Sequence, residues 1–70
     1  MDINKIILPR ERYSEAKDII AWCNDNIGEG DPWNDKIFKP NKWCCRIDFG
    51  YQHFQFIDER DALMFALRWT

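Results

Sequence analysis

The sequence has no block of basic residues, no long hydrophobic run and only one histidine. Ten lysines and arginines are balanced by twelve aspartates and glutamates, so the net charge of −2 gives no electrostatic footprint for nucleic acid. The acidic residues are dispersed, which does not favour mimicry of DNA by carboxylates. A membrane span would need about 18 consecutive apolar residues, and secretion would need a charged and then apolar leader. Since neither is present, we expect a soluble, cytoplasmic protein with no membrane partner.

The three cysteines do not support a disulfide framework or a zinc site. Cys44 and Cys45 are adjacent, and neighbouring residues of a strand point to opposite faces, which opposes a bridge between them. Cys23 and Cys45 fall on apolar faces, where a small buried thiol is the common case. Zinc requires cysteine or histidine pairs at ligand spacing, and Cys44-Cys45 with the single His53 does not supply them. We expect a reducing compartment, no metal and no cofactor.

Aromatic residues are abundant instead. The 70 residues predict a single domain, residues 1–70, close to the lower size limit for an independent core. Four Trp, five Phe and two Tyr compensate for the small size, because each can bury ~150–250 Å². This content excludes a disordered chain.

The segment from residue 43 to residue 57 is predicted to form a β-hairpin. Alternate residues of a strand share a face. With Gly50 and Tyr51 at the centre of the turn, Ile47 faces Phe54, and nearly all the large apolar residues lie on one side. Glycine at the first central position suits a type II′ turn, which requires a positive φ there.

The other side of this hairpin is predicted to be mostly polar and to face water. Asp48 lies opposite His53 in this register, as an ordinary solvated cross-strand pair. Small α+β sheets can stack nucleic-acid bases on exposed aromatic residues. This side offers only Tyr51, His53 and Arg46, and excess positive charge is missing, so nucleic acid is the less favoured partner.

A helix is predicted to follow the hairpin and to run to the end of the sequence. Asp58 is its expected N-cap, and Asp61 in the first turn complements the helix dipole. Its apolar residues cover roughly 200° of arc, well beyond the ~100° stripe of a simple surface helix; they are Ala62, Leu63, Phe65, Ala66, Leu67 and Trp69. The surplus arc can be covered by the long loop, by the first helix or by a second protein chain.

The first half of the chain predicts a strand and a helix. Residues 3–8 are short, β-branched and ended by Pro9, as in an edge strand. Ser14 is the expected N-cap of a helix that Gly28 ends. The stripe between them has helical spacing and consists of Ala16, Ile19, Ile20, Cys23 and Ile27.

Residues 28–42 have no clear periodicity, and a loop of this length is uncommon in a compact domain. Asp31-Pro32 favours a single helical turn over residues 32–36. Trp33, Ile37 and Phe38 are too apolar for a free linker. Either they fold over the edge of the core, which we favour, or they form an exposed recognition patch.

The order of elements therefore predicts an α+β fold. We expect a two-layer sandwich with a three-stranded mixed sheet in the order 1-3-2 and two helices on one face. The order 1-2-3 is the alternative. A sheet this small leaves edges that need protection or a partner.

No motif predicts an enzyme. Asp48-Phe49-Gly50 matches the metal-binding triplet of protein kinases, but the glycine-rich loop and the catalytic Asp and Asn are missing. Gly28-Glu29-Gly30 follows a helix instead of a strand, and Glu29 would repel phosphate. The acidic residues around Asp58 are explained by helix capping.

The last third of the chain carries the pattern Phe-x-Phe-x-Asp-x-x-Asp-Ala-x-x-Phe-x-Leu-Arg-Trp, formed by Phe54, Phe56, Asp58, Asp61, Ala62, Phe65, Leu67, Arg68 and Trp69. This pattern resembles the ending of small uncharacterised proteins of T4-like tailed phages, including marine cyanophages. The resemblance implies a viral accessory protein that acts in an infected cell. It transfers no activity and no site residue.

These observations favour a non-enzymatic protein-interaction module that binds itself, as a homo-oligomer, or a host or viral protein. The alternative is a small domain that binds single-stranded nucleic acid. The predicted interaction surface consists of Trp33, Phe38, Leu63, Leu67 and Trp69.

Overall fold

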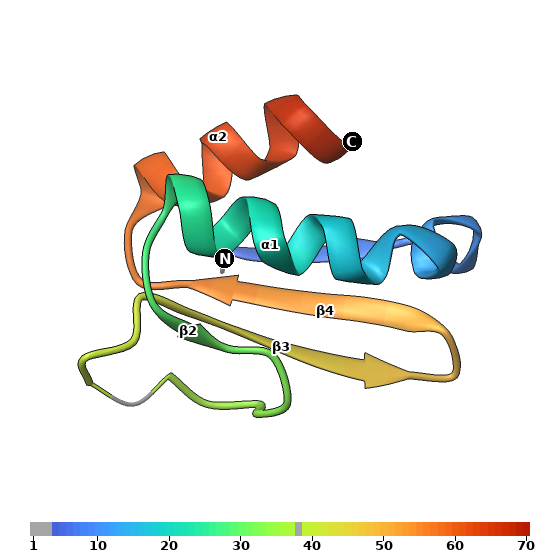
Figure 1. Cartoon of the computed structure of the whole chain (residues 1–70), viewed down its shortest axis with the longest axis horizontal. Coiled ribbons are helices and arrows are strands. Elements are labelled where there is room, and N and C mark those ends of the chain that lie inside the picture. The colour runs from blue at the N-terminus through green and yellow to red at the C-terminus, as the bar shows by residue number, and fades with distance from the viewer. Residues whose placement is uncertain (1–3, 38) are drawn as a thin grey trace.

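The computed structural model describes residues 4–37 and 39–70 and shows an α+β fold (Figure 1). A short strand is followed by a 3-10 helix and an α-helix, and the hairpin and the last helix follow a second short strand. In chain order the elements are β1 (Lys5–Leu8), η1 (Arg10–Glu15), α1 (Ala16–Asn26), β2 (Gly30–Asp31), β3 (Trp43–Asp48), β4 (Tyr51–Phe56) and α2 (Glu59–Trp69).

The sheet has four strands in the order β1-β4-β3-β2, and not the three that the sequence predicts. The additional strand, β2, is two residues long and pairs parallel to β3. β4 lies between β1 and β3 and is antiparallel to both, so the three longer strands follow the order 1-3-2. Figure 1 shows α1 and α2 on the same face of the sheet. We call the opposite side of the sheet the outer face.

The predicted centre of the hairpin turn is wrong by one position. Phe49 and Gly50 occupy it, with φ values of 52° and 86°, as a type I′ turn requires. Ile47 therefore lies opposite Gln52 instead of Phe54. Moving the turn by one residue shifts each opposed pair by two positions, and two positions keep every side chain on its face. The error therefore leaves the faces of the residues within β3 and β4 as predicted, but Phe49, which was expected on the core side, lies in the turn and is 86% exposed.

Gln52 helps to explain the register. Its side chain is buried, and Nε2 donates a hydrogen bond of 3.0 Å to the backbone oxygen of Arg12 in η1. The contact fastens the start of β4 to a segment distant in sequence. The expected Asp48–His53 pair is also wrong, since Asp48 lies opposite Tyr51 and Arg46 lies opposite His53.

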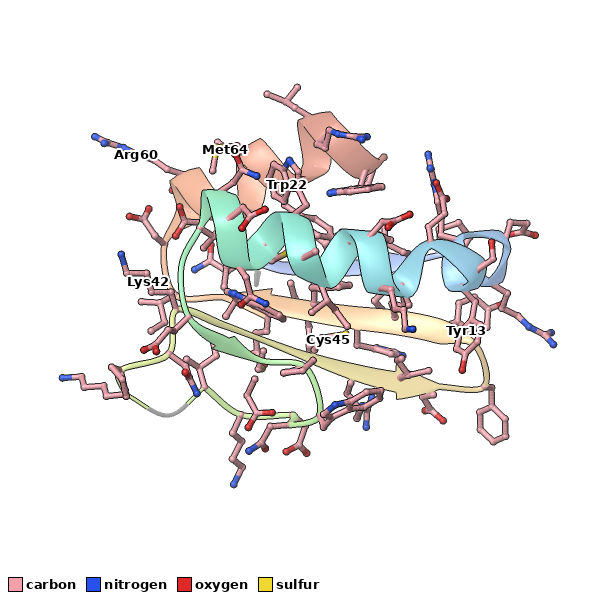
Figure 2. The ribbon with its side chains drawn as sticks, in the orientation of Figure 1. Tyr13, Trp22, Lys42, Cys45, Arg60 and Met64 are labelled. Atoms are coloured by element: carbon pink, nitrogen blue, oxygen red, sulfur yellow. The ribbon has the colours of Figure 1, made fainter. Side chains whose placement is uncertain are left out.

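The core lies between the sheet and the two helices. Phe54 and Phe65 are in direct ring contact, with centroids 4.6 Å apart. Cys45 points from β3 toward α1 (Figure 2). The buried hydrophobic cluster consists of Leu8, Ile19, Cys23, Ile27, Trp43, Cys45, Phe54, Phe56, Ala62, Phe65 and Trp69.

Two of the three predicted helix ends are confirmed. Asp58 caps α2, because its side chain accepts a hydrogen bond of 2.9 Å from the backbone N–H of Arg60. Gly28, with φ of 133°, ends α1 and donates its N–H to the oxygen of Cys23. Ser14 is not an N-cap: it lies inside η1, which begins directly after Pro9 and runs into α1.

The segment between α1 and β3 is held by Gly30 and Asp31. A Cβ on Gly30 would lie 2.0 Å from the ring of Trp43, so only glycine allows β2 to approach β3 there. The Asp31 side chain accepts hydrogen bonds from the N–H of Trp33 and from the amide of Asn34. The Asp31 carboxylate thus stabilises a local turn through hydrogen bonds to residues two and three positions later. The helical turn predicted for residues 32–36 does not form.

Candidate functional site

The residues of the predicted interaction surface do not form one exposed patch. Leu63 and Leu67 are 57% and 89% exposed on α2, and Trp33 is 74% exposed in the segment after β2. Trp69 is only 4% exposed and belongs to the core. Phe38 lies outside the described residues. Of the three apolar residues expected to cover the core edge, Trp33 stays in solvent and Ile37 is half-buried.

Trp69 is buried because α1 supplies a partner for it. Its ring meets Trp22 edge to face at 6.3 Å, and Trp22 meets Phe65 in the same way at 6.1 Å. The guanidinium of Arg68 lies 4.1 Å from the centre of the Trp69 ring. Such contacts add about 0.5–1.5 kcal/mol each to the burial of the rings. The first helix therefore covers one end of the surplus apolar arc of α2.

The rest of that arc is uncovered. Arg60, Leu63, Met64 and Leu67 recur at i, i+3, i+4 and i+7 and form one side of the helix. We call these four residues the α2 outer stripe. All four are exposed, and Arg60 and Met64 project away from the sheet in Figure 2. Three neighbouring large apolar side chains in solvent contribute nothing to the core of this chain.

The two ends of α2 carry opposite charge. Glu59 and Asp61 lie in the first turn and Arg68 lies in the last. This distribution complements the helix dipole and stabilises α2. It also makes the helix electrostatically complementary to an antiparallel copy of itself.

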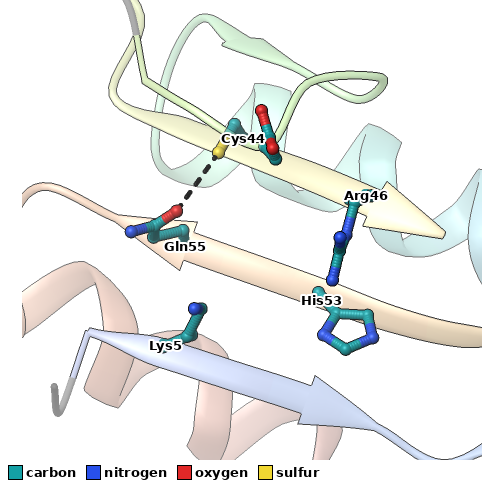
Figure 3. A pocket seen from close by; sticks show the side chains of 6 residues that line it. Lys5, Cys44, Arg46, His53 and Gln55 are labelled. Atoms are coloured by element: carbon teal, nitrogen blue, oxygen red, sulfur yellow. Dashed lines mark hydrogen bonds between the residues drawn. The ribbon is translucent and has the colours of Figure 1, made fainter. Parts of the chain in front are cut away.

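A polar pocket of about 140 Å³ opens on the outer face (Figure 3). Its lining comes from three strands and from the segment after β2. Arg46 and His53 are directly opposed on β3 and β4, and both Lys5 and Cys44 are opposed to Gln55. We call it the outer-face pocket; it is lined by Lys5, Asp35, Cys44, Arg46, His53 and Gln55.

The cations of this pocket are not neutralised by the protein. Among the described residues the only salt bridge joins Arg12 and Glu15, which are not in the lining of the pocket. Neither Lys5 nor Arg46 therefore forms a salt bridge with a carboxylate within the described part of the chain.

Cys44 and Gln55 lie beneath these cations. The thiol of Cys44 contacts Oε1 of Gln55 at 3.8 Å, which leaves the amide nitrogen of Gln55 as a donor for the pocket. Burial raises the pKa of the Cys44 thiol, with further increases from Asp31 and Asp35 and an opposing effect from Lys5. The thiol is therefore neutral at physiological pH and is not a nucleophile.

A second, more apolar hollow of about 470 Å³ lies beside the start of α2. Burial and the neighbouring Asp58 raise the pKa of the Asp61 carboxyl, and Lys42 partly offsets this increase. The lining consists of Lys39, Pro40, Asn41, Lys42, Ile57, Asp58 and Asp61.

The buried thiols of Cys23 and Cys45 are also unreactive, since desolvation raises the pKa of each to about 12. In residues 4–37 and 39–70 no group of three or more His, Cys, Asp or Glu side chains is arranged to hold a metal ion. Across the same residues, no helix has both the length and the apolar character to cross a membrane.

Sequence reasoning placed Arg46 and His53 on one face but missed Lys5 and Asp35 as their neighbours. Lys5 and Gln55 meet only because β1 pairs with β4 in one particular register. Asp35 lies in a segment without regular secondary structure. The periodicity of apolar residues in the sequence therefore could not predict its contact with the pocket.

Comparison with known proteins adds no relative: no protein-family model, no curated protein and no solved structure matches this chain.

Proposed function

We propose that this chain is a non-enzymatic protein-interaction module that associates with a second copy of itself through the α2 outer stripe. The exposure of Leu63 and Leu67 carries this proposal. Full burial of a leucine side chain contributes about 1.5–3 kcal/mol. Both side chains forgo most of that energy in the isolated chain, and an interface would recover it.

Charge favours a second copy as the occupant. When two α2 helices lie antiparallel, the acidic first turn of each meets the end that carries Arg68 in the other. The helix dipoles also oppose each other favourably, and the first turn stays acidic on balance because Glu59 and Asp61 outnumber Arg60. A two-fold interface of this kind is self-complementary.

The size of the stripe predicts weak association. A helix of 11 residues is only about 16 Å long, at 1.5 Å per residue. One such helix pair buries less than the ~800 Å² per partner of a standard interface. We therefore expect a monomer–dimer equilibrium that reaches the dimer only at high protein concentration.

Sedimentation equilibrium over a wide range of concentration tests this proposal. The wild-type chain should form dimers at the high end, and Leu67→Glu should remain monomeric. Because Leu67 is almost fully exposed in the isolated chain, its replacement should change the free energy of unfolding by no more than about 0.5 kcal/mol. Lost association with unchanged thermal stability separates an interface residue from a core residue.

Ile7→Glu is the matched control. Ile7 is 54% exposed on β1, and its side chain lies on the outer face, away from the helices, so this variant should dimerise like the wild type. A wild-type chain that stays monomeric at the highest concentration refutes self-association. Equal loss of dimer in both variants would place the interface elsewhere.

Single-stranded nucleic-acid binding on the outer face is the second candidate. The side chains of Arg46, His53 and Tyr51 on that face favour it. The net charge of −2 weighs against it, because phosphate neutralisation by lysine and arginine dominates such affinities. Fluorescence anisotropy of labelled single-stranded DNA and RNA at low salt tests this candidate. An anisotropy that stays unchanged at tens of micromolar protein would exclude nucleic-acid binding.

The biological setting belongs to the same proposal. The phage-like ending of the sequence supports an accessory role in the cytoplasm of an infected cell. Affinity purification of the tagged chain during infection would test this setting, with recovery of the untagged chain expected from the self-association proposal.

A further inference from the structure

The outer-face pocket brings together more hydrogen-bond donors than the protein itself uses. Lys5 offers three N–H donors, Arg46 five and Gln55 two, and His53 keeps at least one N–H in either protonation state. None of these side-chain groups donates within the described part of the chain. Figure 3 shows Arg46 above His53 on one side of the pocket and Lys5 and Gln55 on the other. Donors from three strands thus surround one space.

We propose that the outer-face pocket binds a phosphate group. The pocket volume of about 140 Å³ is four to five times the ~30 Å³ that one water occupies in the liquid. That room is sufficient for a tetrahedral anion. A phosphate group presents three strong acceptor oxygens, which match donors that approach from separate directions. Arginine and lysine are the side chains that most often bind such oxygens.

Asp35 gives the pocket a preference among anions. Its carboxylate would repel any fully ionised anion, since like charges at short range disfavour each other. A phosphate group, however, keeps a proton on one oxygen up to about pH 6, and that P–OH can donate to the Asp35 carboxylate. Sulfate has the same shape but carries no proton near neutral pH. Phosphate should therefore bind more tightly than sulfate, with Asp35 as the residue that discriminates.

This inference does not depend on self-association, because the pocket and the α2 outer stripe lie on opposite faces of the sheet. Its test is a titration of the full chain at pH 6, followed by ¹H–¹⁵N NMR. Inorganic phosphate should shift the side-chain signals of Arg46 and Gln55 saturably, and sulfate should bind more weakly. A parallel titration with methyl phosphate shows whether the pocket takes the free anion only or also a phosphate monoester.

Two variants are decisive. Arg46→Gln should weaken phosphate binding about tenfold or more, the usual effect of losing a charge-assisted hydrogen bond. Asp35→Asn should tighten sulfate binding and so reduce the preference for phosphate. Lys17→Gln is the control, since it removes one positive charge from an exposed position on α1, on the other face of the sheet, and should leave binding unchanged.

The proposal fails if phosphate produces no saturable shifts at the pocket. Equal weakening by Arg46→Gln and Lys17→Gln would also overturn it, because the effect would then come from net charge alone. An unchanged preference for phosphate in Asp35→Asn would remove the assigned role of Asp35.

Discussion

Replacement of Gly30 by alanine tests how the segment between α1 and β3 is held. A Cβ at this position would lie 2.0 Å from Cε2 and 2.2 Å from Cδ2 of Trp43, where carbon atoms prefer ~3.5–4.0 Å. Trp43 is fully buried, and its Nε1 donates a 2.8 Å hydrogen bond to the oxygen of Gly28. The ring therefore has no free space to move into, and either it or β2 must shift.

The expected cost combines two effects. Overpacking a filled core costs about 1–3 kcal/mol, and a buried indole N–H that loses its acceptor costs about 1–3 kcal/mol more. We expect Gly30→Ala to lower the free energy of unfolding by about 2–6 kcal/mol. The total free energy of unfolding of a chain of 70 residues is roughly 3.5–10.5 kcal/mol, at about 0.05–0.15 kcal/mol per residue. At a slope of about 1 kcal/mol per molar urea, the midpoint should fall by about 2 M or more.

The sign of the change in the free energy of unfolding distinguishes the packing argument from the ordinary effect of replacing glycine by alanine. Gly30 does not have a positive φ, so without the contact alanine should stabilise the chain by about 0.4–1 kcal/mol through the unfolded state. Urea unfolding followed by circular dichroism measures the difference. Glu29→Ala, at the exposed neighbouring position, is the control and should change stability by less than about 0.5 kcal/mol. A Gly30→Ala variant as stable as wild type would refute the packing argument.

Two further predictions concern α2 and the buried thiols. Asp58→Ala should cost about 1 kcal/mol in urea unfolding, because the N–H of Arg60 loses its capping acceptor; Asp58→Asn, which can still cap, should cost much less. Above pH 9 the thiols of Cys23 and Cys45 ionise in the unfolded chain but not in the folded one, where their pKa is about 12. The folded state then binds more protons, so stability should fall from pH 9 towards pH 12 by up to about 1.4 kcal/mol per pH unit for each thiol. Cys23→Ala should show a shallower fall, and a pH-independent stability in this window would contradict the assignment.

The hairpin shows which parts of the fold local sequence determines. Alternation of apolar and polar residues separated the core side of β3 and β4 from the outer side, because a strand has period two whatever its partner. The turn could not be placed in the same way. A positive φ at Phe49 is unusual for a bulky residue, and it is accepted here because Gln52 is fastened to the backbone of η1. That contact joins residues 40 positions apart, beyond the reach of any turn rule.

The last helix shows the same division. Its helical spacing and its Asp58 cap were predictable from adjacent residues, and the apolar arc was correctly found to be wider than one core face. Periodicity alone could not decide which part of the arc the chain itself covers. Trp22 covers Trp69, whereas Leu63 and Leu67 have no such neighbour and stay in solvent.

The arrangement of layers has a consequence for how the two proposed surfaces work. Both helices lie on one face of the sheet (Figure 1), so the α2 outer stripe and the outer-face pocket face opposite directions with the whole core between them. Sites this far apart with no shared partner are generally independent in energy. A dimer formed through α2 would therefore leave both phosphate pockets open, one on each outer side. The chain could then hold a copy of itself on one face while it binds an anion on the other.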